Sequence, residues 1–248
     1  MEGRPTLSGS LLTVAMRHRV GAVALDVNFR LTQPWTLLFG PSGSGKTTVL
    51  RAIAGFVRPD AGRIESASEA WFDAAANVFV PPHKRAVRSA GQMARLFPHM
   101  TVARNIGYGS GSGSNVGEIA DELMVSFGLR ELAERMPQDL SGGERQRASV
   151  ARALVAAITF EGRERPLLLL DEPLAGLDVA MRDRMVTELK QWTERWKIPV
   201  LSVTHALGEA FLLEAEVVKI ADGQVAQHGQ VGEVLAEERA QLLRQLRG

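Results

Sequence analysis

The amino-acid sequence predicts an α/β fold in which helices cover both faces of a central sheet. Three short runs are nearly all apolar, as is typical of strands buried on both faces; they are Trp35–Phe39, Leu167–Leu170 and Val200–Val203. A fourth run, Val23–Leu31, alternates apolar and polar residues and therefore predicts a half-buried strand. Together with Leu11–Met16 it indicates an antiparallel sheet near the N-terminus.

The middle of the chain has a different pattern. Over residues 91–157 the apolar residues mostly follow helical spacing, and strand patterns are few. We therefore expect a single domain over residues 1–248. Its core and antiparallel sheet comprise residues 1–90 and 158–248, and residues 91–157 form an inserted helical subdomain.

The C-terminal part predicts a hairpin followed by a helix. The pair Asp222-Gly223 separates two strand-like runs, which is typical of a tight hairpin turn. A stripe of apolar residues at helical spacing then predicts one closing helix; the stripe consists of Val231, Val234, Leu235, Leu242 and Leu246.

Composition excludes several classes of function. The chain has 29 Lys and Arg residues against 28 Asp and Glu residues, so it lacks the strong positive field that attracts nucleic acid. It contains no cysteine, which excludes disulfides and thiolate metal sites and fits a cytoplasmic protein. No apolar run approaches the roughly 18 residues needed to cross a bilayer. Residues 1–10 lack the features of an export signal.

A phosphate-binding loop is predicted directly after Trp35–Phe39. Residues 40–47 match the pattern G-x-x-x-x-G-K-[ST] and precede an amphipathic helix, which is the context that the pattern requires. Backbone N–H groups of such a loop surround phosphate oxygens, and the start of the helix adds its positive dipole end. Lys46 would contact the β- and γ-phosphates, and Thr47 would coordinate Mg²⁺. The predicted loop comprises Gly40, Pro41, Ser42, Gly43, Ser44, Gly45, Lys46, Thr47 and Thr48.

Two adjacent carboxylates, Asp171 and Glu172, end the apolar run Leu167–Leu170. Catalytic groups of an open α/β sheet gather at such strand ends. We expect Asp171 to hold Mg²⁺, directly or through water, and Glu172 to orient the attacking water as general base. The alternative is a solvated acidic turn without a function.

Further motifs make the chain similar to the ATP-binding cassette (ABC) ATPases. Leu140–Arg147 resembles the signature of that family, and Pro173–Asp178 resembles the segment that follows its catalytic glutamate. Gln92, the segment Leu96–His99 and His205 agree in order. The resemblance covers the chain from about residue 11 to 229. It implies a P-loop NTPase (RecA-like) core with an N-terminal antiparallel β-subdomain and an inserted α-helical subdomain.

The resemblance also implies that each nucleotide site is shared between two copies of the chain. Ser141, Gly142 and Gly143 would form a second phosphate cradle that closes over the ATP of the other copy, so that two chains stack head to tail around two Mg-ATP. The alternative is an ordinary helix with Ser141 as its N-cap.

By the same resemblance three more residues receive roles. His205 would contact the γ-phosphate and help to organise Glu172 and the water. Gln92 would reach Mg²⁺ or the water and report the nucleotide state to the helical subdomain. Asp178 would lie at the dimer seam.

Two segments depart from the family pattern. The family usually presents an aromatic ring to adenine near its first strands, but the matching stretch Arg17–Gly21 has none, which leaves His18 or an arginine to stack on the base. Residues Arg88–Gly91 are more polar than the apolar strand expected before Gln92.

The resemblance further implies a membrane partner on separate chains. Cassettes of other machines carry coiled coils, cysteine-bound zinc or two cassettes in one chain, and none of these features occurs here. The groove beside Gln92 and the segment Leu96–Val102 would receive a cytoplasmic helix of a permease, which places the chain in the cytoplasm, peripheral on the inner membrane face. The segments Ala94–His99 and Asn105–Gly109 look most like molybdate importers, served indirectly by a solute-binding protein. Alternatives are importers for sulfate, iron or polyamines, or a soluble regulatory cassette without transport.

Overall fold

The computed structural model describes residues 10–67, 69–91, 95–111, 115–162 and 164–245. Within these ranges the strands form one eleven-stranded sheet with the order β6-β5-β4-β1-β2-β11-β10-β3-β9-β8-β7. The strands are β1 (Leu12–Val20), β2 (Val23–Leu31), β3 (Trp35–Phe39), β4 (Ala61–Ser66), β5 (Ala70–Asp73), β6 (Val78–Phe79), β7 (Val87–Gly91), β8 (Leu167–Asp171), β9 (Val200–Val203), β10 (Glu216–Ala221) and β11 (Gln224–Gln230).

The sheet has a parallel half and an antiparallel half. Strands β10, β3, β9, β8 and β7 pair in parallel, whereas β1, β2, β4, β5 and β6 pair antiparallel. The predicted hairpin β10–β11 is confirmed, and β11 joins the two halves through a parallel pairing of Gln224 with Asp26. The antiparallel strands predicted near the N-terminus are thus an extension of the core sheet.

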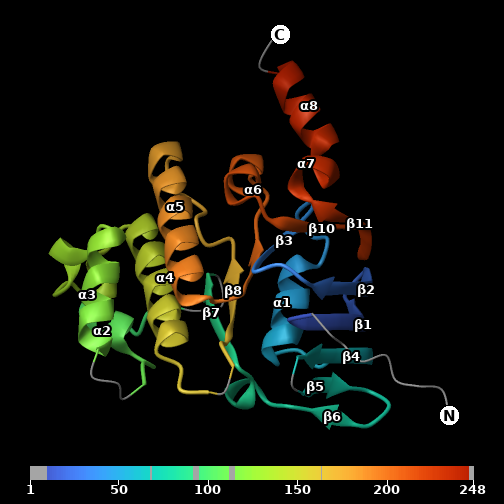
Figure 1. The fold of residues 1–248 in the computed structure, drawn as a ribbon, viewed down its shortest axis with the longest axis horizontal. Coiled ribbons are helices and arrows are strands. Elements are labelled where there is room, and N and C mark those ends of the chain that lie inside the picture. The colour runs from blue at the N-terminus through green and yellow to red at the C-terminus, as the bar shows by residue number, and fades with distance from the viewer. Residues whose placement is uncertain (1–9, 68, 92–94, 112–114, 163, 246–248) are drawn as a thin grey trace.

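Helices cover the two faces of the parallel half (Figure 1). One face packs against α1 (Lys46–Ala54), and the other packs mainly against α4 (Gly142–Ile158) and α5 (Val179–Trp196). Along β8, Leu167 and Leu169 belong to the core of the first face, and Leu168 and Leu170 belong to that of the second. This double burial explains the continuous apolar runs.

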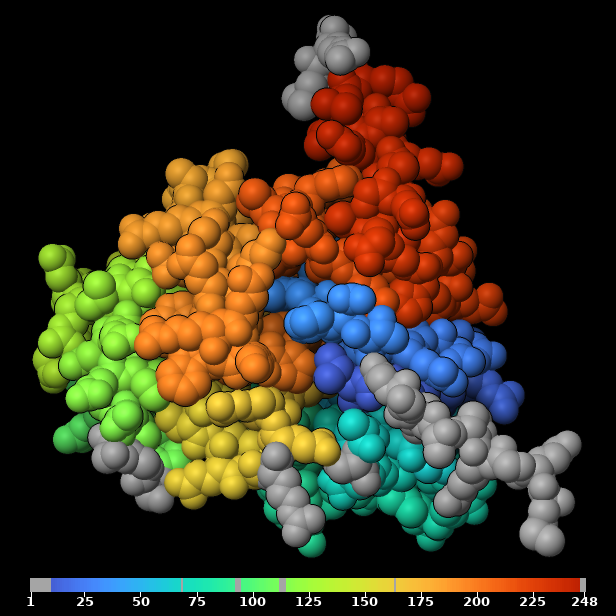
Figure 2. Space-filling view, in the orientation of Figure 1, coloured from blue at the N-terminus to red at the C-terminus, as the bar shows by residue number. Residues whose placement is uncertain are grey.

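The other helices are α2 (Val102–Gly107), α3 (Val116–Ser126), α6 (Leu207–Leu213), α7 (Val231–Val234) and α8 (Ala236–Gln245). Three 3₁₀ turns cover Pro82–Lys84, Arg130–Leu132 and Pro137–Asp139. In the space-filling view the green α2 and α3 lie at the left end of the molecule, and the blue and teal antiparallel strands lie at the right (Figure 2).

The polar stretch Arg88–Gly91 lies in an edge strand, β7, which pairs with β8 on one side. An edge strand tolerates polar side chains because one of its sides is not covered by another strand. The Arg88 guanidinium stacks over the Phe160 ring at 4.7 Å from its centroid. Gly91 is required by packing, since a Cβ there would lie 2.1 Å from the carbonyl oxygen of Asp171.

The single closing helix predicted from the C-terminal stripe is wrong. The chain forms two helices, α7 and α8, and only the first part of the stripe is buried, at Val231, Val234 and Leu235. Leu242 is 41% exposed, and Leu246 lies outside the described residues. Helical spacing placed these residues on one stripe, but α8 projects from the body of the protein (Figure 1) and has no core to cover.

A buried arginine connects the C-terminal end of α1 to the region of the antiparallel strands through hydrogen bonds. Arg85 is 2% exposed, and its guanidinium donates to the carbonyl oxygens of Ala52 (2.8 Å), Ile53 (2.7 Å), Trp71 (3.1 Å) and Val80 (2.8 Å). Burial lowers the pKa of Arg85 to about 10, so it stays charged at neutral pH. The four bonds hold the helix that begins at Lys46 in a defined position.

We therefore predict that Arg85→Leu lowers the free energy of unfolding by about 3 kcal/mol or more, because several buried carbonyl groups lose a charged donor. Urea unfolding followed by circular dichroism measures the change. The matched control is Arg58→Leu, which removes an exposed arginine bonded to Asn77 and should cost less than about 1 kcal/mol. Equal losses in the two variants would contradict this role of Arg85.

Candidate functional site

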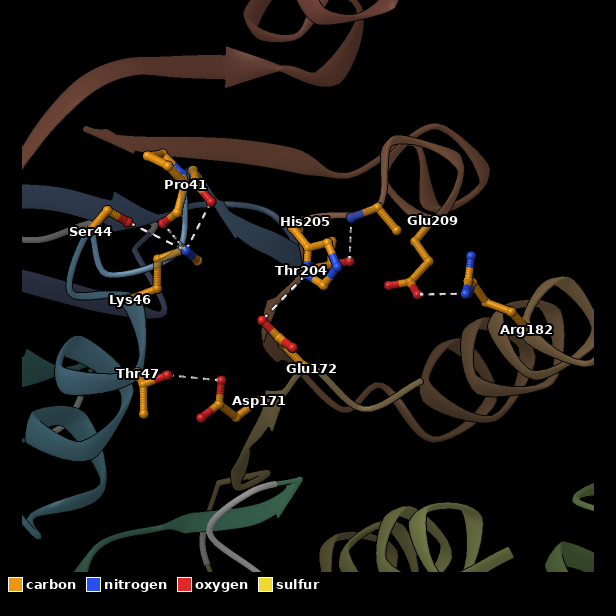
Figure 3. A network of polar contacts seen from close by, with 12 residues as sticks. Pro41, Ser44, Lys46, Thr47, Asp171, Glu172, Arg182, Thr204, His205 and Glu209 are labelled. Carbon is orange, nitrogen blue, oxygen red and sulfur yellow. Dashed lines mark hydrogen bonds and ion pairs between the residues drawn. The ribbon is translucent and has the colours of Figure 1, made fainter. Parts of the chain in front are cut away.

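The candidate site lies where three neighbouring parallel strands end. Strands β3, β9 and β8 are adjacent in the sheet, so their carboxyl ends share one edge. The loop 40–45 follows β3, Asp171 and Glu172 lie at the end of β8, and Thr204 and His205 follow β9. Figure 3 shows the side chains of this edge facing one another. The strand, loop and helix order predicted for the phosphate-binding pattern is confirmed.

The glycines of the loop 40–45 occupy positions that favour glycine for different physical reasons. Gly40, Gly43 and Gly45 have φ of 150°, 81° and 98°, values that other residues rarely adopt. A Cβ at Gly40 would lie 2.1 Å from the Ile220 carbonyl oxygen, and one at Gly45 would lie 2.2 Å from Leu25 Cδ2. A Cβ at Gly43 would meet no atom within 4 Å, so this side of the loop is open to a ligand.

Lys46, the first residue of α1, folds back across the loop (Figure 3). Its ammonium group donates to the carbonyl oxygens of Gly40 (2.9 Å) and Pro41 (2.7 Å) and lies 3.4 Å from Ser44 Oγ. Burial lowers the pKa of Lys46, and the charges of Glu172 and Asp171 oppose that shift. No side chain caps the start of α1, because its N-cap is Gly45. The loop therefore surrounds one fixed cation at a helix N-terminus.

Asp171 offers an oxygen that has no hydrogen bond among the described residues. Asp171 is 1% exposed, its Oδ1 accepts a hydrogen bond from Thr47 Oγ1 at 3.2 Å, and its Oδ2 is buried without a partner in that part of the chain. Burial raises the pKa of Asp171, while the bond from Thr47 lowers it. Buried polar atoms normally have partners. A hard cation that takes oxygen ligands would satisfy this carboxylate together with the Thr47 hydroxyl.

Within the part of the chain that the structure describes, no group of three His, Asp or Glu side chains could hold a metal. The protein thus offers Thr47 and Asp171 as a small oxygen set, which suits Mg²⁺ because that ion keeps waters and phosphate oxygens as further ligands. Gln92, the third predicted ligand, lies outside the described residues.

Glu172 and His205 lie side by side. Glu172 Oε1 is 3.3 Å from His205 Nδ1, and the two side chains are 29% and 68% exposed. Glu172 has a φ of 48°, which is strained for a residue with a Cβ and is typical of functional turns. Its backbone N–H donates to the Val203 carbonyl oxygen at 3.1 Å. The chain thus holds a carboxylate and an imidazole at the open end of the site.

Gln146 was not singled out by the sequence. Its side-chain amide donates to the carbonyl oxygen of Glu172 at 3.1 Å, so it ties α4 to the strained residue after β8. The only feature of the sequence that could have pointed to Gln146 was its place within the motif Leu140–Arg147, because helical spacing does not show which strand a polar side chain faces.

The second predicted cradle is the start of α4. Ser141 is its N-cap, as predicted, and forms a capping box in which Ser141 Oγ accepts from Glu144 N–H (3.2 Å) and Glu144 Oε2 accepts from Ser141 N–H (2.7 Å). The bond from Ser141 lowers the pKa of Glu144. Ser141 and Gly142 are exposed, and a Cβ on Gly143 would lie 2.8 Å from Leu177 Cδ2.

Within one chain the two predicted cradles are separate. Helices α1 and α4 pack on opposite faces of the sheet, and the capping bonds of Ser141 stay within its own helix start. Asp178 is exposed and caps α5 by accepting from Met181 N–H at 2.9 Å.

At the predicted adenine end, His18 is engaged with a carboxylate. His18 Nδ1 lies 3.2 Å from Asp60 Oδ1, and the His18 side chain is 16% exposed. Asp60 also accepts from Arg19 N–H at 2.9 Å, which is the main cause of its lowered pKa. The side chains of Arg17 and Arg19 are the more exposed candidates on this strand.

The segment that precedes α2 is organised by a buried asparagine. Asn105 accepts from Phe97 N–H at 2.7 Å and donates to the carbonyl oxygens of Phe97, Met100 and Thr101 at 2.9–3.1 Å. The Phe97 ring packs against the half-exposed ring of Tyr108, 4.3 Å away. These contacts fix the conformation of the segment before α2 and of the surface that it forms.

In the described ranges no helix combines the length and apolarity needed to cross a bilayer.

Comparison with known proteins identifies relatives of the chain. Residues 25–175 match the model of a family described as ABC transporter. The molybdenum import ATP-binding protein ModC of Rhodospirillum rubrum is 40% identical over 230 residues, which cover 91% of this chain and 60% of the relative. The protein of the same name in Mesorhizobium japonicum is 39% identical, with coverages of 92% and 62%. The chain thus spans about 60% of the length of these relatives.

Solved structures have the same fold. A dimeric structure of the ATP-binding cassette MJ0796 in a post-hydrolysis state, bound to ADP and Pi, superposes with a TM-score of 0.71 at 24% identity, covering 89% of this chain and 98% of that one. A second dimeric structure of MJ0796, a bacterial ABC transporter cassette, gives the same values. These similarities confirm the predicted fold class. Because the family model matches more than half of the length of this chain, the chain belongs to the ABC transporter family.

Proposed function

We propose that this chain is the ATP-hydrolysing subunit of an importer. The observation that carries the proposal is the arrangement at one sheet edge, where Lys46, the Thr47–Asp171 pair and the Glu172–His205 pair converge. These groups cover the requirements of phosphoryl transfer to water, namely a phosphate cradle, a magnesium site and a base. The ATP-binding relatives named above support the same assignment.

Residues Gly40–Thr48 would bind the phosphates of ATP. Their backbone N–H groups and the N-terminus of α1 face the phosphate oxygens, and the ammonium group of Lys46 is delivered to the β- and γ-phosphates. Mg²⁺ would be held by Thr47, Asp171 and Gln92, where it would neutralise charge on the phosphate oxygens. Ser42, Ser44 and the other loop residues shape this cradle.

Glu172 would act as the general base. It accepts a proton from the attacking water as the water oxygen bonds to the γ-phosphorus, and the bond between that phosphorus and the oxygen of the ADP leaving group breaks. His205, 3.3 Å from Glu172, orients this carboxylate and the γ-phosphate. Electrostatic positioning supplies most of the rate increase in such reactions.

We further propose that two copies assemble head to tail, with Ser141, Gly142 and Gly143 of one copy closing over the ATP of the other and Asp178 at the seam. The exposed Ser141 and Gly142, at the N-terminus of a 17-residue helix, support this role. Residues 91–157 would then move as a helical subdomain of one domain that comprises 1–248.

The proposed solute is molybdate, which the names of the molybdenum import relatives support. The chain would act in the cytoplasm, peripheral on the inner membrane face, with the segment Leu96–Val102 docked to a permease on separate chains. A solute-binding protein would deliver the oxyanion to that permease.

The first prediction concerns the base. Glu172→Gln should lower ATP hydrolysis by about a hundredfold or more while ATP binding is retained, because an amide cannot accept the proton. Phosphate release measures hydrolysis, and light scattering should show a dimer with Mg-ATP. Glu194→Gln, an equal charge change on the exposed surface of α5, is the control. Wild-type turnover in the Glu172 variant would refute the role of Glu172.

The second prediction concerns the shared site. Ser141→Arg should abolish hydrolysis but leave nucleotide binding to the monomer nearly unchanged, since its bulk blocks the other copy. Ser141→Ala is the matched control: it loses the same cap, at a cost of about 1 kcal/mol, without adding bulk, and should keep more activity. If Ser141→Arg lost nucleotide binding to the monomer and hydrolysis to the same extent, this residue would act only within its own chain.

The third prediction concerns the solute. With the purified permease complex in vesicles, binding protein loaded with molybdate should stimulate ATP hydrolysis more than the same concentration of empty binding protein. Binding proteins loaded with sulfate, iron or a polyamine are compared under the same conditions. Stimulation by one of these solutes alone would exclude molybdate as the solute.

A further inference from the structure

An ion pair between a buried glutamate and a partly exposed arginine lies next to the loop that carries His205. Glu209, in α6, is 6% exposed, and its Oε1 lies 3.5 Å from Nε of Arg182, in α5. Burial raises the pKa of Glu209, whereas its hydrogen bond with Thr204 and the charge of Arg182 lower it. The Thr204 hydroxyl also accepts from Ala206 N–H at 3.0 Å. Glu209 therefore contacts the loop that carries His205 through Thr204, beside which it lies in Figure 3.

The same arginine reaches the segment that follows Glu172. Arg182 Nη2 donates to the carbonyl oxygen of Leu177 at 3.0 Å, and the next residue, Asp178, caps α5. A guanidinium can hold two partners at once because its donors form a rigid fork. Arg182 thus joins the Glu209 side to the segment 173–178.

Both connections border one small cavity. A space of about 230 Å³ is lined by residues of the two segments together with Arg182 and Glu209. The ion pair therefore forms part of the wall of this cavity. Removing the charge of Arg182 would leave the Glu209 carboxylate buried without its ion-pair partner, and removing the charge of Glu209 would leave the guanidinium without its anion, so that the two segments would rearrange.

We infer that Glu209 and Arg182 are positioning residues, which fix the His205 loop and the segment 173–178 in one arrangement. The inference rests on the proposed function, because His205 and Asp178 receive their roles there. Through this pair, docking of the second copy at the exposed Asp178 would be transmitted to the Glu172–His205 geometry. Neither residue contacts the phosphate-binding loop in the described structure, so the pair acts on turnover and not on ATP binding.

The test compares ATP hydrolysis by the full chain at varied ATP concentration. Glu209→Gln keeps the size of the side chain but removes its charge, and we expect kcat to fall about ten- to a hundredfold with KM within about threefold, since small misplacements of reacting groups cost this much. Arg182→Leu should behave similarly, and Arg182→Lys should recover part of kcat because its cation can still pair with Glu209. Glu214→Gln is the control, since Glu214 ends α6 and forms an exposed pair with Lys190.

Each result bears on one proposal. A wild-type chain that is inactive both alone and in the permease complex would refute the proposed ATPase function. An active wild type with unchanged kcat in Glu209→Gln would overturn the positioning role. If ATP binding and the melting temperature fell together with kcat, and Arg182→Lys recovered none of them, the pair would be a purely structural contact. If Arg182→Leu does not fold, the isosteric Glu209→Gln decides.

Discussion

The buried carboxylate of Asp171 is the constraint on which the arrangement of this protein depends. It lies at the end of β8 and contacts Thr47, while the backbone of Asp171 pairs with Gly91 of the edge strand β7, where there is no room for a Cβ. An ionisable side chain in such a place costs free energy unless it has partners, and among the described residues one of its oxygens has none. Strands buried on both faces hold it there, so the core stabilises a site that is unfavourable by itself.

A second feature follows from the same sheet edge. The residue after Asp171 is turned into a left-handed conformation, and it is held from three directions: by Val203 through the backbone, by Gln146 from α4 and by His205 from the neighbouring loop. Strain of this kind persists where the surroundings determine the conformation. The helical region and the core sheet therefore meet at Glu172, which gives a physical route by which a movement of α4 would reach the proposed base.

The local patterns were sufficient for the apolar strands of the core and for the start of α4. Strands β3 and β9 have the predicted bounds, because each is a short apolar run covered on both faces. The cap of α4 was predictable, since Ser141 and Glu144 satisfy each other locally. The C-terminal helices were not predictable in this way, because a periodic stripe shows which residues share a face of a helix but does not show whether a core lies beneath that face. Arg182 and Glu209 were missed for a related reason: each is an ordinary helical residue until the fold brings them together.

By itself, the sequence determined the residue types proposed to carry the chemistry and the order of the elements that present them: a glycine-rich loop before a helix, two carboxylates after a buried strand, and a histidine after the next strand. These are local properties, set by backbone freedom, periodicity and capping. The tertiary structure decided which groups meet, and it did so through strand order. Because β9 lies between β3 and β8, Thr47 reaches Asp171 and Glu172 reaches His205, while Ser141 starts a helix on the opposite face from α1 and is left exposed.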